Sequence, residues 1–346
     1  MRTLASIQRI KEVKEHTNAD SLELIKVLGW QCVAKKGEFK EGDLCVYFEI
    51  DSLIPMKHEW IRFLQDKNKP SSPARLKTLK LRGEKSQGLA IPLDTILEAP
   101  NVIPISLKEG EDLTELLEVK KYEPVVPACL DGEVIGARPP YTVKTDEDRV
   151  QICEEIIDEF QGKLVYISQK IDGTSATYSY MDGDFQVSGR NWSYVEDDKN
   201  TYWQMAKKLE IREKLKHVFD LSGNSYAIQG EIAGPKIQDN LLGLKDHELF
   251  VFNVMKLNTG EFLGFYEFKE FCDRLELTTV PILQITEFKW QTTDELLELA
   301  DSTSSPNGHV NEGIVIRPVH EFHSNVLKGR ASFKVISNDF LIKTGK

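Results

Sequence analysis

Residues 168–191 read SQKIDGTSATYSYMDGDFQVSGRN, and the first six decide how the rest of the chain is interpreted. Alternate side chains of an extended strand share a face, so Lys170 and Asp172 project together while Ile171 points into the core. Gly173 then permits a tight turn close to a ligand. Lys-x-Asp-Gly alone arises by chance in about one chain of this size in ten, given average residue usage. Its meaning therefore depends on the segments that follow.

Five later segments each place a polar or aromatic candidate on an apolar run, in a fixed order. They are FQVSGRN with Arg190, YAIQGEIAGP with Glu231, LFVFNV with Phe252, NEGIVIRP with Glu312, and SFKVIS with Lys334. That order resembles the covalent nucleotidyltransferase superfamily of ATP-dependent ligases and messenger-RNA capping enzymes, over residues from about 140 to the end. GEIAGP and FVFNV look most like its RNA ligase branch, and the whole chain is similar to RNA ligases of the Deinococcus and Naegleria type.

The pattern of apolar runs predicts an α+β fold in two domains, since 346 residues exceed the usual size of one core. LELIKVLGWQCVAK, GEFKEGDLCVYFEI and RLKTLKLRGEKSQGLAIPL indicate short strands of an OB-like β-barrel over residues 1–135. Strands and helices without a regular βαβ rhythm follow, which predicts a nucleotidyltransferase domain of antiparallel sheets and helices over 136–346. Two helices are expected at TDEDRVQICEEIIDEF, with a capping box formed by Thr145 and Asp148, and at TYWQMAKKLEIREKLKHVF.

The resemblance implies that Lys170 attacks the α-phosphorus of ATP, releases pyrophosphate and holds AMP through a phosphoramidate bond. A lysine has a reference pKa of about 10.4, which leaves roughly one in a thousand neutral near pH 7.4. Its activation therefore requires neighbouring cations, a metal ion or burial. Lys334 is expected to contact the α-phosphate and to help lower the pKa of Lys170.

The resemblance also assigns the remaining contacts. Glu231 accepts a hydrogen bond from the ribose, Phe252 stacks on adenine, and Arg190 contacts the ribose or the 5′-phosphate of the RNA. Asp172 and Glu312 hold Mg²⁺ or Mn²⁺ through its water shell. Each residue has a plainer alternative: a charge at a strand end for Glu231, a core position for Phe252, an ion pair for Arg190 and a turn cap for Asp172.

Two further residues, Gln169 and Arg149, are candidates for contacts with ATP. Arg149 and its neighbour Gln151 are equally compatible with the surface of the first helix. The last motif departs from the pattern, because many ligases carry two lysines separated by one residue there. Here a second cation has to come from elsewhere, and Lys328 and Arg330 are the candidates.

The charge balance restricts how nucleic acid binds. The net charge is 44 − 55 = −11, which opposes indiscriminate binding to a polyanion. One stretch runs against it: KNKPSSPARLKTLKLRGEK, residues 67–85, has seven bases and a single acid. This stretch is a candidate contact for nucleic acid or for pyrophosphate, and a solvated surface is the plainer alternative.

These calls together predict an ATP-dependent RNA ligase that joins 5′-phosphate and 3′-hydroxyl ends, at nicks in duplexes with RNA on the 3′-hydroxyl side. Only twelve residues follow Lys334, which disfavours capping enzymes and the usual DNA ligases, whose OB domain comes last. A nucleic-acid-binding module with an inactive transferase domain, or an unusual DNA ligase, remains the alternative. We expect a monomer, no membrane partner, and a reducing intracellular compartment, because the five cysteines are widely spaced.

Overall fold

The computed structural model describes residues 2–65, 72–97, 108–123, 126–303 and 310–345. Its internal contacts divide the chain into two compact units, which are described separately. Unit 1 comprises residues 1–124 together with 341–346, and unit 2 comprises residues 125–340. The contacts divide the chain after residue 124. The predicted domain boundary between residues 135 and 136 stays a prediction.

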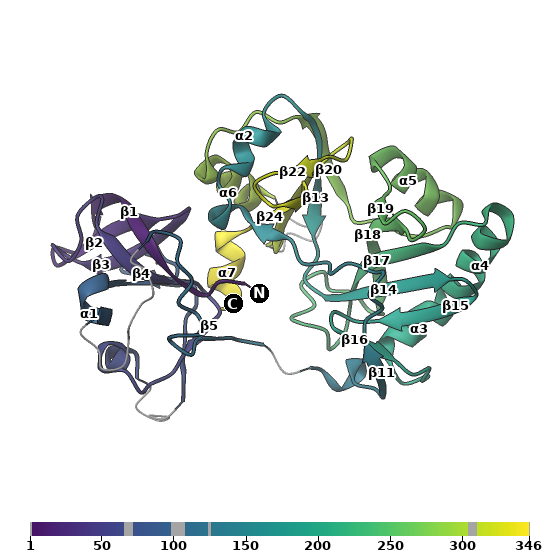
Figure 1. The fold of residues 1–346 in the computed structure, drawn as a ribbon, viewed down its shortest axis with the longest axis horizontal. Helices are drawn as coiled ribbons and strands as arrows, with labels where there is room; N and C mark the ends of the chain where they lie inside the picture. Colours follow the sequence, from purple (N-terminus) through teal and green to yellow (C-terminus); the bar gives the residue numbers. More distant parts are fainter. Residues whose placement is uncertain (1, 66–71, 98–107, 124–125, 304–309, 346) are drawn as a thin grey trace. The chain divides into compact units, whose positions relative to one another are not determined.

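Unit 1 is built on an antiparallel sheet whose strands curl around a hydrophobic core (Figure 1). The strand order is β3-β2-β1-β4-β9. The bounds are β1 (Ala5–Glu15), β2 (Leu22–Val27), β3 (Trp30–Lys35), β4 (Leu44–Phe48) and β9 (Leu89–Pro92). Central strand β1 lies in a segment for which no strand was predicted; its apolar face packs beside Phe48 and Trp60.

Smaller elements complete unit 1. A second sheet has the order β10-β5-β6, and β7 pairs only with β8 as a separate hairpin. The bounds are β5 (Ser52–Ile54), β6 (Ala74–Arg75), β7 (Leu79–Leu81), β8 (Glu84–Ser86), β10 (Lys120–Lys121) and α1 (Leu93–Leu97). Lys67 and Lys69 of the basic stretch lie outside the described residues.

Unit 2 contains two larger sheets. The first has seven strands in the order β11-β16-β15-β14-β17-β18-β19, and every pairing in it is antiparallel. The bounds are β11 (Val134–Ala137), β14 (Thr174–Met181), β15 (Asp184–Ser188), β16 (Trp192–Tyr194), β17 (Tyr226–Ala233), β18 (Glu248–Lys256) and β19 (Glu261–Phe262). Tyr178, Trp203 and Phe268 contribute to the core between this sheet and the helices over residues 201–208, 211–222 and 265–274.

The second large sheet has the order β12-β24-β21-β13-β20. The bounds are β12 (Asp148–Arg149), β13 (Leu164–Lys170), β20 (Ile282–Glu287), β21 (Gly313–Pro318) and β24 (Phe333–Ile336). In addition to α1, the described residues form the α-helices α2 (Ile156–Phe160), α3 (Thr201–Lys208), α4 (Ile211–Ser222), α5 (Phe265–Arg274), α6 (Thr293–Ser302) and α7 (Asn338–Thr344). In the part of the chain that is described, no helix is both long and apolar enough to cross a membrane.

The helix predicted over residues 145–160 is wrong in its first half. Residues 148–149 form β12, which pairs in parallel with β24; a 3₁₀ turn follows, and only Ile156–Phe160 are α-helical. Thr145 caps no helix, since its Oγ1 lies 2.5 Å from Ser175 Oγ. Pairing with a distant strand overrides the local helical spacing. The second predicted helix breaks into α3 and α4 at Glu210, whose φ is 51°.

The glycine of the opening motif serves a different purpose from the predicted one. A β-carbon built on Gly173 would lie 2.3 Å from the carbonyl oxygen of Ile232, in β17. Only glycine therefore allows the chain to leave β13 and enter β14 so close to β17. The close backbone approach, rather than a tight turn, explains the residue.

Candidate active site

Lys170 and Glu312 form an ion pair at the centre of the site. Lys170 ends β13, and Glu312 immediately precedes β21, the neighbouring antiparallel strand. The register sets Lys170 opposite Gly313, so the two side chains meet with Lys170 Nζ 2.8 Å from Glu312 Oε2. Their side chains are only 24% and 15% exposed. Lysine and glutamate side chains are rarely so little exposed, and a charge removed from water needs a partner of opposite charge.

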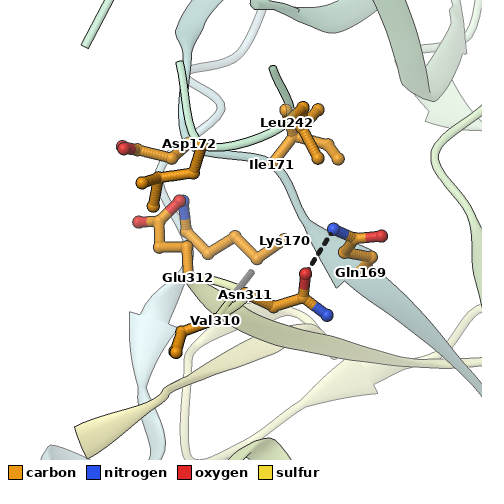
Figure 2. A pocket seen from close by; sticks show the side chains of 9 residues that line it. Gln169, Lys170, Ile171, Asp172, Leu242, Val310, Asn311 and Glu312 are labelled. Atoms are coloured by element: carbon orange, nitrogen blue, oxygen red, sulfur yellow. Dashed lines mark hydrogen bonds and ion pairs between the residues drawn. The ribbon is translucent and has the colours of Figure 1, made fainter. Parts of the chain in front are cut away.

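A pocket lies around this pair (Figure 2). Its lining includes Gln169, Asp172 and Asn311 in addition to the ion pair. Gln169 Nε2 donates to Asn311 Oδ1 over 2.8 Å, so the residues just before Lys170 and Glu312 are joined as well. Asn311 was not predicted; its place directly before Glu312 in NEGIVIRP was the available signal.

Carboxylates keep Lys170 protonated in this structure. Burial lowers its pKa, but Glu312, then Glu231 and Asp172, outweigh burial and hold the pKa above the usual value. The predicted contribution of Lys334 in the opposite direction stays a prediction. A neutral Lys170 requires that the field of these carboxylates be offset.

Glu231 and Phe252 come from adjacent strands of the large sheet, β17 and β18. Burial raises the pKa of Glu231 to about 8, with Lys170 acting against it. Phe252 is half-buried and packs beside the small cluster that contains Ile171. Phe252 thus has core contacts and a partly open ring, which is compatible with both roles predicted for it.

Lys334 lies beside Arg149. The parallel pairing of β12 with β24 sets these two residues opposite each other. Burial, then Arg149 and Lys170, lowers the pKa of Lys334 to about 7. Arg149 is thus a cation beside Lys334, and it belongs to a strand rather than to a helix surface. Of the two candidates for the second cation of the last motif, Arg330 bonds Glu321 and Asn253; the assignment to Lys328 or Arg330 stays a prediction.

Arg190 is engaged in an exposed ion pair. Its Nη2 lies 2.8 Å from Asp146 Oδ1, and the two side chains are 44% and 47% exposed. The pairing alternative describes the arginine in this structure, and exposed pairs of this kind contribute little to stability. Its contact with a nucleotide or an RNA end stays a prediction.

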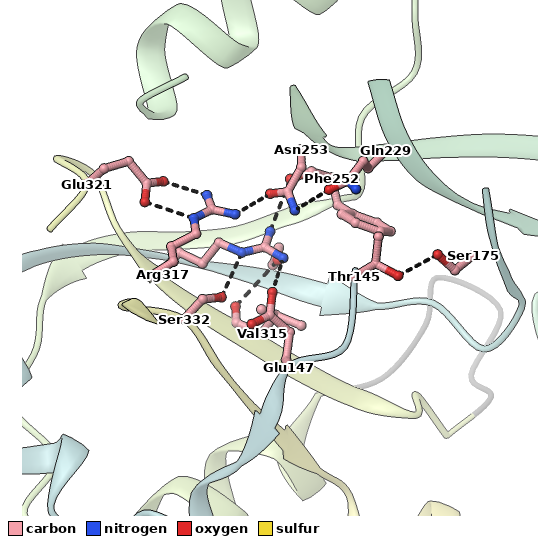
Figure 3. A network of polar contacts seen from close by, with 12 residues as sticks. Thr145, Glu147, Ser175, Gln229, Phe252, Asn253, Val315, Arg317, Glu321 and Ser332 are labelled. Carbon is pink, nitrogen blue, oxygen red and sulfur yellow. Dashed lines mark hydrogen bonds and ion pairs between the residues drawn. The ribbon is translucent and has the colours of Figure 1, made fainter. Parts of the chain in front are cut away.

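A second ion pair, between Arg317 and Glu147, lies in a network of polar contacts (Figure 3). Arg317, near the end of β21, has only 3% of its side chain exposed and donates to Glu147 Oε1 over 2.7 Å. The same guanidinium donates to Ser332 Oγ over 2.9 Å and to the carbonyl oxygen of Phe252 over 3.1 Å. Because it bonds the segments that precede Arg149 and Lys334 as well as β18, one side chain fixes three parts of the site. Burial raises the pKa of Glu147, but Arg317 and then Arg330 outweigh burial and hold it below the usual value.

Sequence reasoning missed both Arg317 and Glu147. The signal for Arg317 was a charged residue inside the apolar run EGIVIRP, which requires a partner when buried. Nothing local pointed to Glu147, because its role depends on a contact 170 positions away in sequence.

Comparisons with known proteins agree with this arrangement. An OB-fold domain profile matches residues 4–93, and the RNA ligase profile matches residues 163–336. The structure of Naegleria gruberi RNA ligase with PPi is 34% identical with a TM-score of 0.88, over 99% of this chain and 98% of that chain. The chain belongs to the RNA ligase family.

Two further structures of the same Naegleria gruberi enzyme are similar. A variant with ATP and Mn is 33% identical with a TM-score of 0.88, covering 100% of both chains. A variant with AMP and Mn is 34% identical with a TM-score of 0.87, covering 98% of each chain. Among curated protein sequences, none matches significantly. These matches confirm the predicted α+β class of this RNA ligase, with an N-terminal OB fold followed by a ligase domain.

We expect the buried pair of Arg317 and Glu147 to dominate the stability of this region. Arg317→Met leaves a buried carboxylate without its cation and should lower the free energy of unfolding by about 3–5 kcal/mol. The double variant Glu147→Gln/Arg317→Met should recover part of that loss, because it leaves no unpaired charge. Urea unfolding monitored by circular dichroism measures both. Arg190→Met, which breaks the exposed pair with Asp146, is the control and should cost less than about 1 kcal/mol. Equal losses in R317M and R190M would contradict a supporting role for the buried pair.

Proposed function

We propose that this RNA ligase joins a 5′-phosphate to a 3′-hydroxyl at nicks in duplexes, through AMP carried on Lys170. The observation that carries the proposal is the ion pair between Lys170 and Glu312. Glu231 acts to raise the pKa of Lys170, and Lys170 acts to lower the pKa of Lys334, so the four side chains interact electrostatically. A nucleophilic amine beside carboxylates and a poorly solvated cation suits phosphoryl transfer, which depends on positioning and charge stabilisation.

ATP suits the cationic side of the site. The pKa of Lys334 is lowered because a buried ammonium lies beside other cations without enough negative charge. A phosphate group placed there would supply that charge. Glu231, which is partly exposed within β17, would present an oxygen to the ribose hydroxyls, and the partly exposed Phe252 would present its ring to adenine.

A divalent metal suits the acidic side. The described residues contain no cluster of three or more side chains able to hold a metal, yet Asp172 and Glu312 line the same pocket. Two carboxylates without a preformed cage suit Mg²⁺ or Mn²⁺, which Asp172 and Glu312 would hold through retained waters. When bound, the ion would offset the carboxylates that keep Lys170 protonated.

The proposed reaction has three steps. Neutral Lys170 Nζ attacks the α-phosphorus; a P–N bond forms, the bond from that phosphorus to the oxygen bridging the α- and β-phosphates breaks, pyrophosphate leaves, and the nitrogen loses one proton to solvent. The 5′-phosphate of the RNA then attacks the same phosphorus, which frees Lys170 and leaves AMP on the 5′ end. The 3′-hydroxyl finally attacks the 5′-phosphate and releases AMP. Lys170 serves as the nucleophile in the first step and as the leaving group in the second.

Covalent labelling tests the first step. Incubation with ATP labelled at the α-phosphate and with Mg²⁺ or Mn²⁺ should give labelled protein, and Lys170→Ala should abolish the label because no amine remains to attack. Lys163→Ala removes an exposed lysine near the start of the same strand and should label normally. Absence of label in the wild type would favour a nucleic-acid-binding protein with an inactive transferase domain. Label surviving in K170A would contradict Lys170 as the nucleophile.

Nucleotide binding should transfer a proton to Lys334. Its pKa of about 7 leaves the amine mostly neutral at pH 8, and an adjacent phosphate raises that pKa, so binding at pH 8 takes up a proton. Calorimetric titration with the α,β-methylene analogue of ATP, in buffers of different ionisation enthalpy, counts the protons. Lys334→Met should reduce the uptake at pH 8 by up to about one proton. At pH 6 the amine is already charged, so wild type and variant should agree. An identical proton count at pH 8 would exclude Lys334 as the phosphate contact.

The RNA preference is tested on nicked duplexes. Sealing should be faster with a ribose than with a deoxyribose at the 3′-hydroxyl end, because a 2′-hydroxyl is the group that distinguishes RNA from DNA. Initial rates on matched duplexes that differ only in that sugar provide the measurement. A duplex with a deoxyribose on the 5′-phosphate side alone is the control and should be sealed at a similar rate. Equal rates with both 3′ sugars would favour an unusual DNA ligase.

A further inference from the structure

The hairpin β7–β8 of unit 1 holds three basic side chains without acidic partners. Lys80, Arg82 and Lys85 form no salt bridge within the described part of the chain. Lys80 and Arg82 are exposed, and Lys85 is partly exposed. The protein as a whole carries an excess of acids, so three unpaired cations within six residues are a local exception.

The strand register places two of these cations opposite each other. Lys80 pairs directly with Lys85 across the hairpin. Side chains of directly opposed residues lie about 5 Å apart on one face, and like charges there oppose strand pairing. An anion lying across both ammonium groups would remove that repulsion. The pairing therefore suits a hairpin that functions with a polyanion bound.

Arg82 occupies the tip of the hairpin in a backbone conformation that favours other residues. It and Gly83 have φ values of 47° and 101°, as a two-residue type I′ turn requires. Asparagine, aspartate or glycine is the usual first residue of such a turn, because a longer side chain is disfavoured at positive φ. The backbone conformation of the turn therefore does not explain an arginine at position 82, and the residue is exposed.

The tip is held in place by the connection that follows β1. His16 Nε2 lies 3.1 Å from the carbonyl oxygen of Leu81, and Asn18 Nδ2 donates to that of Arg82 over 3.1 Å. Thr17 Oγ1 donates to Glu84 Oε1 over 2.7 Å, so the single carboxylate of the hairpin already has a hydrogen-bond partner. The cations are thus presented on a fixed framework rather than on a loose loop, which lowers the entropy cost of binding.

We propose that the basic hairpin, residues 79–86, binds the phosphodiester backbone of the RNA substrate. This inference rests on the proposed function, and it assigns the substrate contact to unit 1. Backbone phosphates supply regularly spaced negative charges, which Lys80, Lys85 and Arg82 neutralise together. The contact is independent of sequence, because it involves no base edges.

The test compares Lys80→Ala/Arg82→Ala/Lys85→Ala with a control that removes the same charge elsewhere on unit 1. Lys40→Ala/Lys108→Ala/Lys120→Ala is that control, since these lysines are exposed and outside the hairpin. Fluorescence anisotropy with a labelled nicked RNA duplex, without ATP, should show affinity reduced about tenfold or more in the hairpin variant only. The slope of log affinity against log salt should fall by about three, one for each lost phosphate contact.

Two activity measurements separate this contact from the chemistry. The hairpin variant should label its lysine with ATP as the wild type does, but should seal poorly a nick whose 5′ end already carries AMP. It should also be no less stable than the wild type to heat, because the opposed lysines are gone. Lysine labelling reduced as strongly as sealing would place the hairpin in the ATP step and overturn the proposal.

Unchanged affinity and salt slope, or equal losses in the control, would also overturn it. Failure of the proposed function looks different: the wild type itself would neither label nor seal, while the binding comparison would still decide whether the hairpin contacts RNA. Lys80→Arg/Lys85→Arg, which keeps both charges, should retain wild-type affinity.

Discussion

The ion pair between Lys170 and Glu312 is the constraint on which the active site depends. Removing an ammonium and a carboxylate from water costs several kcal/mol each, and only close pairing with further polar contacts offsets that cost. The register between β13 and β21 provides the pairing, and the hydrogen bond from Gln169 to Asn311 fixes the preceding residues in the same register. A slip of one residue would turn Lys170 towards the opposite face of the sheet. The reactive amine is therefore located by strand pairing rather than by a loop.

Strand β21 has a comparable role at its other end. Glu312 precedes the strand and holds Lys170, while Arg317 near its end holds Glu147, Ser332 and the carbonyl oxygen of Phe252. The two buried ion pairs have opposite polarity along the strand, with the acid first and the base last. Each pair fixes a different part of the site: Lys170 at one end, Phe252 and the segments of Arg149 and Lys334 at the other. Rigid placement of groups by such pairs is what phosphoryl transfer requires.

The sequence motifs predicted which residues gather, but not how their charges interact. Lys170, Glu231 and Lys334 lie on strands whose alternation is readable locally, and Glu312 directly precedes such a strand. All four contribute to one electrostatic cluster. The position of Arg149 was not predictable, because a two-residue strand paired with a segment far along the chain leaves no periodic signal.

The helix predicted over residues 145–160 failed for the same reason, since long-range pairing decided the conformation of residues 148–149. Arg317 and Glu147 likewise became partners only once the sheet had formed. Local pattern therefore identified the strands and the candidate residues on them, whereas contacts between distant strands placed Arg149 beside Lys334 and formed the ion pair of Arg317 with Glu147.

The active site of unit 2 and the hairpin of unit 1 balance their charges in opposite ways, and this difference bears on what each of them binds. In unit 2, Lys170 and Arg317 each have a carboxylate oxygen within 2.8 Å, so both cations are already paired. A ligand that brings charge must then reorganise existing pairs, which makes binding sensitive to protonation and selective for the arrangement of charge. In the hairpin of unit 1 the cations have no carboxylates to give up, and any strand of phosphates can approach them without breaking a pair. Carboxylates beside the cations of the active site would make that site selective for a nucleotide. Their absence beside the cations of the hairpin would let the hairpin accept RNA of any sequence. A net charge of −11 opposes indiscriminate binding, whereas the basic hairpin has a single acid, Glu84, which accepts a hydrogen bond from Thr17.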